Sequence, residues 1–446
     1  MQRLTVMRTR PLLVSVFSIL ALTGTTTAAA APQTCGPTFP TRHAYARAIG
    51  YDGVTRWTTP LTLAQGADGS TLPPLVDGAI SYVAQDGYLT ALATADGRRL
   101  WQAKPGGSLY NIWRYRNLLA VLADQVGNHA TVTGYVAATG AVRWRYRIPG
   151  LGLYNTIAQT TGGALAWIRG DGLLQTLDLG TGKLRWSVRV GKNEAQLQFH
   201  GAVVSTTGGV VLFAGNGALA AYNEHTGKRL WRTPRLPEQP QLAVSAGVVA
   251  MTSGNTGKVP PRVVGVDLVT GRQLWQRRLP TTYGLTLTGT TAGFLVTGGA
   301  YPAFREYQLA THTGKTRWSA PAQLLPQVTG AQAIVGNDLL QVTFSYDLYR
   351  KYTLHDRDLR TGHQRWQVAL HGAPARAGLV AASPTQVYLL GPANGSNPKG
   401  EVYAYALTTG QPLWTAKAPT WLGVPPAFGP DGLLLAEVDP GNACPV

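Results

Sequence analysis

The sequence predicts an all-β fold, a β-propeller of four-stranded blades, and three observations lead to this prediction. A glycine is followed four residues later by a tryptophan nine times along the 446-residue chain. Short apolar stretches separated by turn residues fill the intervals between these pairs. The chain has 53 glycines and 29 prolines and only 13% charged residues, so it is rich in turns. Its hydrophobic content of 44% is enough to bury a core, which excludes bulk disorder.

The first thirty residues have the pattern of a secretory signal peptide. Arg3, Arg8 and Arg10 precede an apolar stretch from Leu12 to Leu22, and small residues end at Ala30. We expect cleavage there, which leaves one propeller domain over residues 31–446 in the periplasm or outside the cell. An N-terminal membrane anchor is the alternative, but the eleven apolar residues are short for a span. No later apolar run reaches the roughly 18 residues that cross a bilayer, so we expect no transmembrane span.

The only two cysteines, Cys35 and Cys444, lie near opposite ends of the exported chain. An oxidising compartment would allow them to pair, and we expect one disulfide between them. Two free thiols are the alternative, because the sequence does not show whether the sulfur atoms are close. Cys35 does not follow the Leu-small-small tripeptide of a lipoprotein signal, which disfavours a lipid anchor.

Each repeat is about 45 residues long and predicts one blade. Seven of the nine glycines follow Thr and two follow Asp, which is typical of a tight turn that needs a left-handed residue. A short strand precedes each turn, as at Leu173 to Leu179, and the tryptophan opens another. Two further apolar stretches complete four strands. A sheet with two apolar faces must stack on its neighbours, and radial stacking closes a ring.

The recurring tryptophans are expected to be structural. A large indole at a fixed place in every unit is best explained as a wedge between adjacent blades, where it also finds a hydrogen-bond partner. A role in stacking on a cofactor is the alternative. The residues are Trp57, Trp101, Trp144, Trp186, Trp231, Trp275, Trp318, Trp366 and Trp414.

Eight complete units run from about residue 70 to 418, and an incomplete unit lies at each end. Residues 44–61 offer only the last two strands of a unit, and residues 423–438 offer only the first two. The two halves could join in a composite ninth blade that closes the ring. The proposed bond between Cys35 and Cys444 would then hold this closure together. Eight and nine blades both remain open at this point.

The segments from Leu173 to Trp186 and from Tyr403 to Trp414 resemble the pyrroloquinoline-quinone-like propeller repeat, with its pattern Ala-x-Asp-x-x-Thr-Gly-x-x-x-Trp. One branch of that family contains quinone-dependent dehydrogenases with adjacent cysteines beneath the quinone and a Glu/Asn/Asp calcium site. The other branch is noncatalytic and includes a lipoprotein scaffold of outer-membrane β-barrel assembly. This chain has no adjacent cysteines and no matching acidic cluster. The resemblance therefore implies the noncatalytic branch, without cofactor, metal or catalytic residue.

The positive charge is concentrated after the repeat turns. The net charge is +18, and the eight residues after each of the nine glycines contain 21 of the 36 Lys and Arg residues that follow residue 30, and no Asp or Glu. Sixteen of these follow five consecutive glycines, from Gly97 to Gly271. In this repeat type the strand that begins with the tryptophan is the outermost of its blade, so we expect a basic arc on the circumference of the ring. Its centre would be Arg143, Arg145, Arg147, Arg185, Arg189, Arg229, Arg232, Arg235, Arg277 and Arg278.

Two explanations of this arc compete. Basic residues on exposed outer strands prevent edge-to-edge pairing between molecules. The arc could instead bind a polyanion such as nucleic acid, anionic lipid headgroups or an acidic envelope polymer. Tyr110, Trp113, Tyr115 and Tyr146 could stack on bases or could simply pack in the core.

His355, Asp356 and Asp358 form the densest polar cluster, but no partner base or nucleophile accompanies them. We therefore name no catalytic group. The expected function is that of an exported, noncatalytic, monomeric scaffold that binds envelope proteins. The alternatives are polyanion or nucleic-acid binding through the basic arc and, third, a quinone-dependent dehydrogenase.

Overall fold

The computed structural model describes residues 43–62, 71–125, 129–149, 157–169, 171–190, 203–215, 218–233, 241–253, 262–280, 285–299, 304–322, 332–344, 352–371, 379–391, 400–418 and 424–439. These ranges contain strands and turns and no helix. They all lie in the compact unit Thr34–Val446. The predicted signal peptide, Cys35, Cys444 and Arg235 fall outside the described residues.

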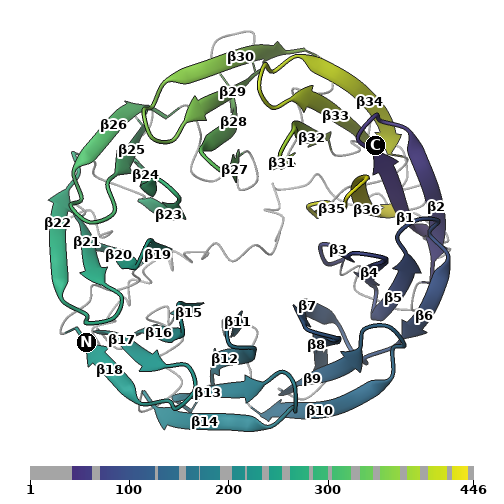
Figure 1. The fold of residues 1–446 in the computed structure, drawn as a ribbon, viewed down its shortest axis with the longest axis horizontal. Coiled ribbons are helices and arrows are strands. Elements are labelled where there is room, and N and C mark those ends of the chain that lie inside the picture. The colour runs from purple at the N-terminus through teal and green to yellow at the C-terminus, as the bar shows by residue number, and fades with distance from the viewer. Residues whose placement is uncertain are drawn as a thin grey trace, which may run out of the picture. The chain divides into compact units, whose positions relative to one another are not determined.

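The strands form nine four-stranded antiparallel sheets arranged as blades of a ring, so the predicted β-propeller is confirmed (Figure 1). Eight blades are continuous in sequence, and each runs outward from its first strand. Four of them are β3 (Leu75–Asp77), β4 (Ile80–Gln85), β5 (Tyr88–Ala93) and β6 (Arg99–Ala103); β7 (Leu109–Tyr115), β8 (Leu118–Gln125), β9 (His129–Val136) and β10 (Val142–Pro149); β11 (Ile157–Gln159), β12 (Ala164–Ile168), β13 (Leu173–Asp178) and β14 (Leu184–Arg189); and β15 (Val203–Thr207), β16 (Val210–Gly215), β17 (Ala218–Asn223) and β18 (Arg229–Arg232).

The other four continuous blades follow the same order around the ring. They are β19 (Leu242–Ser245), β20 (Val248–Ser253), β21 (Arg262–Asp267) and β22 (Gln273–Arg278); β23 (Thr286–Thr290), β24 (Gly293–Gly298), β25 (Arg305–Leu309) and β26 (Thr316–Pro321); β27 (Gln332–Val335), β28 (Asp338–Phe344), β29 (Tyr352–Asp358) and β30 (Gln364–Leu370); and β31 (Leu379–Ala382), β32 (Gln386–Gly391), β33 (Gly400–Ala406) and β34 (Pro412–Ala418).

The ninth blade combines both ends of the described chain, as the two half repeats predict. Its order is β2 (Thr55–Leu61), β1 (His43–Gly50), β36 (Gly432–Asp439) and β35 (Ala427–Phe428). Strands β1 and β36 pair antiparallel from His43 opposite Asp439 to Gly50 opposite Gly432. Inside this blade, Arg47 Nε donates to Oε1 of the buried Glu437 at 2.8 Å. The open count of eight or nine blades is thereby resolved as nine.

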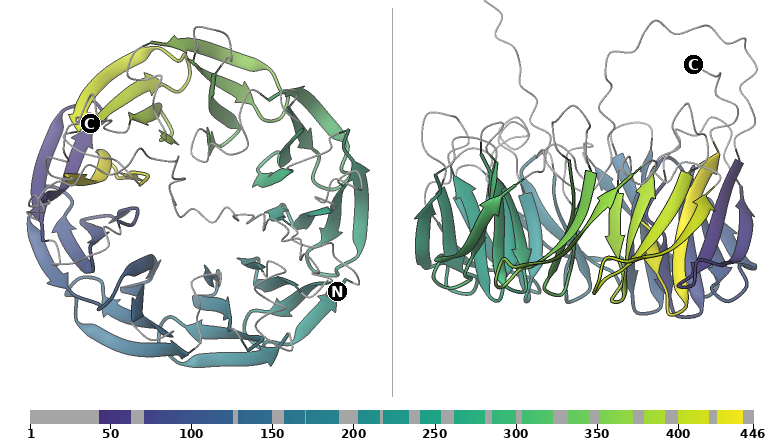
Figure 2. Two further views of the ribbon diagram at one scale, coloured as in Figure 1. Left: turned by 180° about the vertical axis from the view of Figure 1, so that it is seen from behind. Right: turned by 90° about the horizontal axis from the view of Figure 1, so that it is seen from above.

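The turn between the third and fourth strands explains the recurring Thr-Gly. In the β13–β14 turn, Gly182 has a φ of 67°, and its N–H donates to the carbonyl of Asp178 at 2.8 Å. The Asp178 carboxylate accepts a second bond, from the N–H of Thr181. A one-residue register shift follows between Thr176 and Leu177, which places the tryptophan beside the neighbouring blade. Antiparallel order puts these turns and the first turn of each blade on one rim of the ring (Figure 2).

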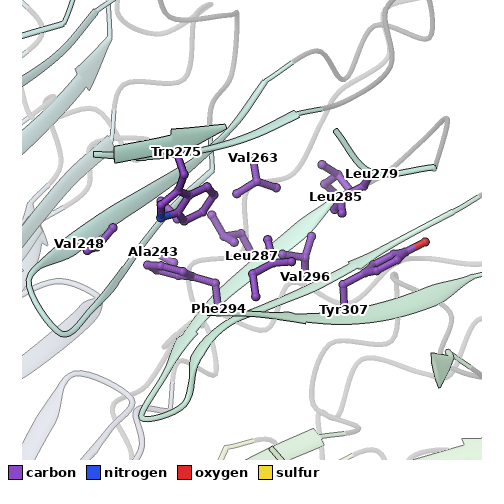
Figure 3. Packing of buried hydrophobic residues seen from close by; sticks show 12 residues of the cluster. Ala243, Val248, Val263, Trp275, Leu279, Leu285, Leu287, Phe294, Val296 and Tyr307 are labelled. Carbon is purple, nitrogen blue, oxygen red and sulfur yellow. The ribbon is translucent and has the colours of Figure 1, made fainter. Parts of the chain in front are cut away.

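The apolar core lies between the blades and not in a single centre. Figure 3 shows one such layer, in which Trp275 of β22 packs over Phe294 of β24, with 6.0 Å between ring centroids. Val263 and Leu287, from the two facing blades, belong to the same buried cluster. Each blade therefore buries both faces, as a wedge in a ring must. No membrane-spanning helix occurs within the described ranges.

Candidate binding surface

Every repeat tryptophan lies on the outermost strand of one blade and connects that blade to its neighbour. Its Nε1 donates to a backbone carbonyl of the next blade in all nine cases, at 2.7–3.1 Å. In chain order the acceptors are Thr94, Ala137, Leu179, Glu224, Leu268, Thr311, Leu359, Leu407 and Tyr51. The last of these returns to the composite blade, so the series is cyclic. The indoles are buried or half-buried, so their rings are occupied by protein contacts.

The repeat glycine lies against the indole of the preceding blade. A Cβ at any of the nine glycines would lie 2.4–2.7 Å from a ring atom of that tryptophan, closer than real contacts allow. Gly271, for example, has a φ of 70° and would place its Cβ 2.5 Å from Trp231. The two signals in the sequence, glycine and tryptophan, are thus the two halves of one contact between blades.

The positive charge lies on outermost strands. Figure 1 shows these strands, β6, β10, β14, β18 and β22, along the outer edge of the ring. These five strands belong to consecutive blades. We call the described Lys and Arg residues on them and on their preceding turns the basic arc. Its members are Arg98, Arg99, Lys104, Arg143, Arg145, Arg147, Lys183, Arg185, Arg189, Lys228, Arg229, Arg232, Arg272, Arg277 and Arg278. All fifteen except Arg185 are exposed.

Strand β10 shows why these side chains point outward. Arg143, Arg145 and Arg147 alternate with Trp144 and Tyr146, so the period of two puts the arginines in solvent and half-buries the rings. Among the described residues, no exposed member of the basic arc forms an ion pair with an acidic side chain. The exposed cations of the arc are therefore not held in ion pairs within the described part of the ring.

Arg185 differs from the rest and belongs to the interior. Its Nη2 lies 2.6 Å from Oδ2 of Asp178, and its Nη1 lies 4.0 Å from the buried Glu224 of the next blade. Burial alone would raise the pKa of Asp178, but hydrogen bonds from Arg185 and Thr181 outweigh it and lower the pKa below its usual value. The sequence carries a signal for this pair that we missed. An Asp four residues before the repeat glycine and an Arg three after it recur only at Asp178/Arg185 and Asp358/Arg365, and both pairs form.

The four candidate stacking aromatics do not form a surface on the basic arc. Tyr110, Trp113 and Tyr115 lie on β7, the innermost strand of its blade, and Trp113 is buried. Tyr146 is on β10, but its ring packs against Trp167 at 5.9 Å between centroids. The three residues on β7 lie away from the arc, because their strand is the innermost of its blade and the arc strand β10 is the outermost.

A polar network fills part of the β27–β30 blade and its border with the β23–β26 blade. Arg365 contacts Asp338. Its Nη2 lies 2.6 Å from Oδ2 of Asp358, and its Nη1 lies 3.6 Å from Oδ2 of Asp356. At the border, the Gln341 amide donates to Glu306 of β25, and its oxygen lies 3.1 Å from Nε2 of His355. The sequence could not reveal the partner Gln341, because the contact to Glu306 crosses between blades.

Burial changes the titration of this network. It lowers the pKa of His355 to about 4, with a further contribution from Arg357, so the imidazole is neutral at pH 7. It raises the pKa of Asp356 to about 6, with repulsion from Asp358 adding to the effect. Burial also raises the pKa of Glu306. His355 is thus bonded to Gln341, whereas the buried Asp356 carboxylate makes no hydrogen bond among the described residues and lies 3.6 Å from Arg365.

A quinone site does not fit the residues present. The two cysteines of the chain are not adjacent, so the cysteine pair of the dehydrogenase branch is missing. Within the described ranges, no group of three or more His, Cys, Asp or Glu side chains could hold a metal ion. We derive no reaction step through a quinone.

The ring of nine blades, with its repeated glycine–tryptophan contact, defines a β-propeller of the pyrroloquinoline-quinone-like repeat class. The chain belongs to the family described as outer membrane protein assembly factor BamB, whose model matches residues 36–150, 128–288 and 215–425. A comparison with curated proteins gave no match.

Solved structures with similar folds include an assembly-factor homologue by name, an initiation factor and a dehydrogenase. BamB from Moraxella catarrhalis is 19% identical over 72% of this chain and 89% of its own, with a TM-score of 0.45. A eukaryotic initiation factor is 10% identical over 90% of this chain and all of its own, with a TM-score of 0.58. A europium-containing methanol dehydrogenase is 12% identical over 74% of this chain and 82% of its own, with a TM-score of 0.46. These similarities concern the fold alone.

Proposed function

We propose that this chain is an exported, noncatalytic propeller that acts as a monomeric binding scaffold in the cell envelope. Membership in a family described as an outer membrane protein assembly factor supports the location and the role. The ion-paired arginines support a noncatalytic role, because Arg185 and Arg365 are both bound by acidic side chains. The docking surface is the basic arc, and its partner is an acidic face of an envelope protein.

The observation that carries this proposal is the set of fourteen exposed cations of the basic arc that lack an ion pair among the described residues. Protection of outer strands from edge pairing accounts for charge on each strand, but acidic residues would protect equally well. The concentration of one sign on five consecutive blades favours a complementary partner, because complementary potentials speed association and select partners.

Site-specific photocrosslinking in intact cells tests the scaffold. The crosslinking amino acid replaces Ser187 on β14 within the arc or, as control, Thr415 on β34 outside it. Both are exposed and directly follow a repeat tryptophan. We expect a discrete adduct with an acidic envelope protein from position 187 only, and its loss when Arg143, Arg145 and Arg147 become Gln. Equal adducts from both positions, or none from position 187, would contradict the proposal.

A second candidate is polyanion binding by the same surface. It is favoured by the composition of the arc, in which eleven of the fourteen exposed cations are Arg, because the guanidinium fork suits bidentate contacts to phosphate. Affinity for a polyanion that falls steeply with salt would support it.

The noncatalytic assignment is tested separately by incubation with quinone and calcium, followed by a dye-linked oxidation assay with alcohols and sugars; turnover would overturn it.

A further inference from the structure

The shape of the basic arc restricts which polyanion it can bind. The arc lies on the outer, convex edge of the ring and spans five of the nine blades, so from β6 to β22 it turns through four of the nine blade-to-blade steps, a little under half of the circumference (Figure 1). A partner that engages all five outer strands must bend by the same amount. Chain stiffness is therefore as important for binding as charge.

Duplex nucleic acid can follow this path only at a bending cost. Bending about 20–30 base pairs by 40–90° already costs about 1–6 kcal/mol, and the elastic cost at fixed length rises with the square of the angle. A duplex would touch the convex edge on one or two blades and leave the rest of the arc unbound. A flexible single chain has no comparable bending cost and can follow the outer strands from blade to blade.

In its described strands, the arc also lacks exposed aromatic side chains on which bases could stack. Its large aromatic side chains are the repeat indoles, and each described indole gives its N–H to a carbonyl of the next blade and its face to a turn glycine. Tyr146 packs against Trp167. Single-strand binders that hold bases use exposed aromatic platforms, whereas guanidinium groups contact the phosphates of any such chain.

We propose that the basic arc binds a flexible, linear polyphosphate chain through its backbone, across several blades and without contacts to bases. This inference rests on the polyanion-binding form of the proposed function and specifies its ligand. A flat anionic membrane is a poorer match, because a plane meets a convex edge on few strands at a time. Each additional blade contributes about three cations. Affinity should therefore rise with chain length until the arc is filled.

The test measures binding of the full exported chain to four labelled or immobilised probes at several salt concentrations. The probes are long-chain inorganic polyphosphate, short-chain polyphosphate that reaches one blade, duplex DNA with the same number of phosphates as the long chain, and phosphatidylglycerol vesicles. We expect the long chain to bind at least about tenfold more tightly than the duplex. Contact with nine phosphates, from three blades, predicts a log–log salt slope near −6, from about −0.7 per contact for flexible strands.

Matched variants separate the inference from the function on which it rests. The arc variant changes Arg143, Arg145 and Arg147 to Gln, and the control changes the exposed Lys315, Arg317 and Lys417, outside the arc, to Gln. Only the arc variant should lose affinity for the long chain, by about tenfold or more. One outcome is that duplex and long-chain polyphosphate bind the wild type equally well and that the arc variant loses affinity for both to the same extent. In that case the flexible-chain inference fails while polyanion binding stands. If no probe binds, or vesicles bind best, or both variants weaken binding alike, the arc is not the polyphosphate site.

Discussion

The indole Nε1 of Trp414 donates a hydrogen bond of 2.8 Å to the backbone carbonyl of Tyr51, which lies 363 positions earlier in the chain. This is the same contact that joins every other pair of neighbouring blades. The ring is therefore closed by the same kind of indole–carbonyl bond as the other joints, across a much larger sequence separation. Tyr51 also accepts a bond from Gln386 at 2.8 Å, so its carbonyl has two donors.

The second donor to the Tyr51 carbonyl predicts that the joints between blades differ in how much stability they lose when the indole N–H is removed. Trp231→Phe removes the indole N–H that bonds Leu268, and we expect the free energy of unfolding to fall by about 1–3 kcal/mol, because a buried carbonyl loses its partner. Trp414→Phe should cost less, since Gln386 still satisfies Tyr51. Denaturant titration of both variants measures the difference. An equal loss in both would show that the N–H bond is not what makes the joint sensitive.

The turn glycines should be intolerant of a methyl group for two separable reasons. Gly271→Ala imposes a left-handed φ and a Cβ 2.5 Å from Trp231, whereas Gly247→Ala imposes a similar φ with no atom within 4 Å. The control should cost about 1–2 kcal/mol for the backbone alone. Gly271→Ala should cost a further 1–3 kcal/mol, roughly, for the clash. Thermal unfolding of the two proteins compares them, and equal costs would refute the close glycine–indole contact.

Asp356 predicts a pH-dependent gain in stability on its removal. It pairs with Trp366 where other blades have alanine, as at Ala91, Ala221 and Ala404. Because folding raises its pKa from 3.8 to about 6, the folded state loses stability as pH rises through that window.

Asp356→Ala should therefore stabilise the protein at pH 7 by about 1–3 kcal/mol, at roughly 1.4 kcal/mol per pKa unit, and the gain should vanish below pH 4. The effect of His355 runs the other way, since its lowered pKa removes stability as pH falls from 6.5 to about 4. Subtracting wild type from variant at each pH cancels the His355 contribution. A stability gain of Asp356→Ala that is constant with pH, or a loss of stability at pH 7, would contradict the raised pKa of Asp356.

The proposed disulfide is favoured by the pairing of the first and last strands. His43 lies opposite Asp439, and Cys35 and Cys444 are eight and five residues beyond these ends in sequence. Mass spectrometry of exported, unreduced protein should find the peptides of both cysteines linked. Reduction should lower stability by up to about 5 kcal/mol, and Cys35→Ser with Cys444→Ser should reproduce that loss. Two free thiols in freshly exported protein would disprove the bond.

The sequence was sufficient for the fold because the repeat signal is itself a contact between blades. A glycine that must leave room for an indole and an indole that must fill it cannot vary independently, so both remain visible in all nine units. The composite blade followed from two half repeats whose strands complement each other.

The surface was predictable only in part. The outward position of Arg143 follows from its strand and the period of two, but Arg185, in the same position before a tryptophan, faces inward to Asp178 and Glu224. The difference depends on acids in its own turn and in the next blade. Likewise, the bond of Gln341 to Glu306 joins blades whose relative register no local pattern encodes.

The most direct test of this account is hydrogen exchange at the indole N–H groups, followed by NMR of protein labelled with 15N at tryptophan. The nine repeat indoles should exchange only through global unfolding, as a group with a common free energy, because each N–H is bonded across a blade border. Rapid exchange at several of these nine positions in the native protein would mean that the indoles do not join the blades.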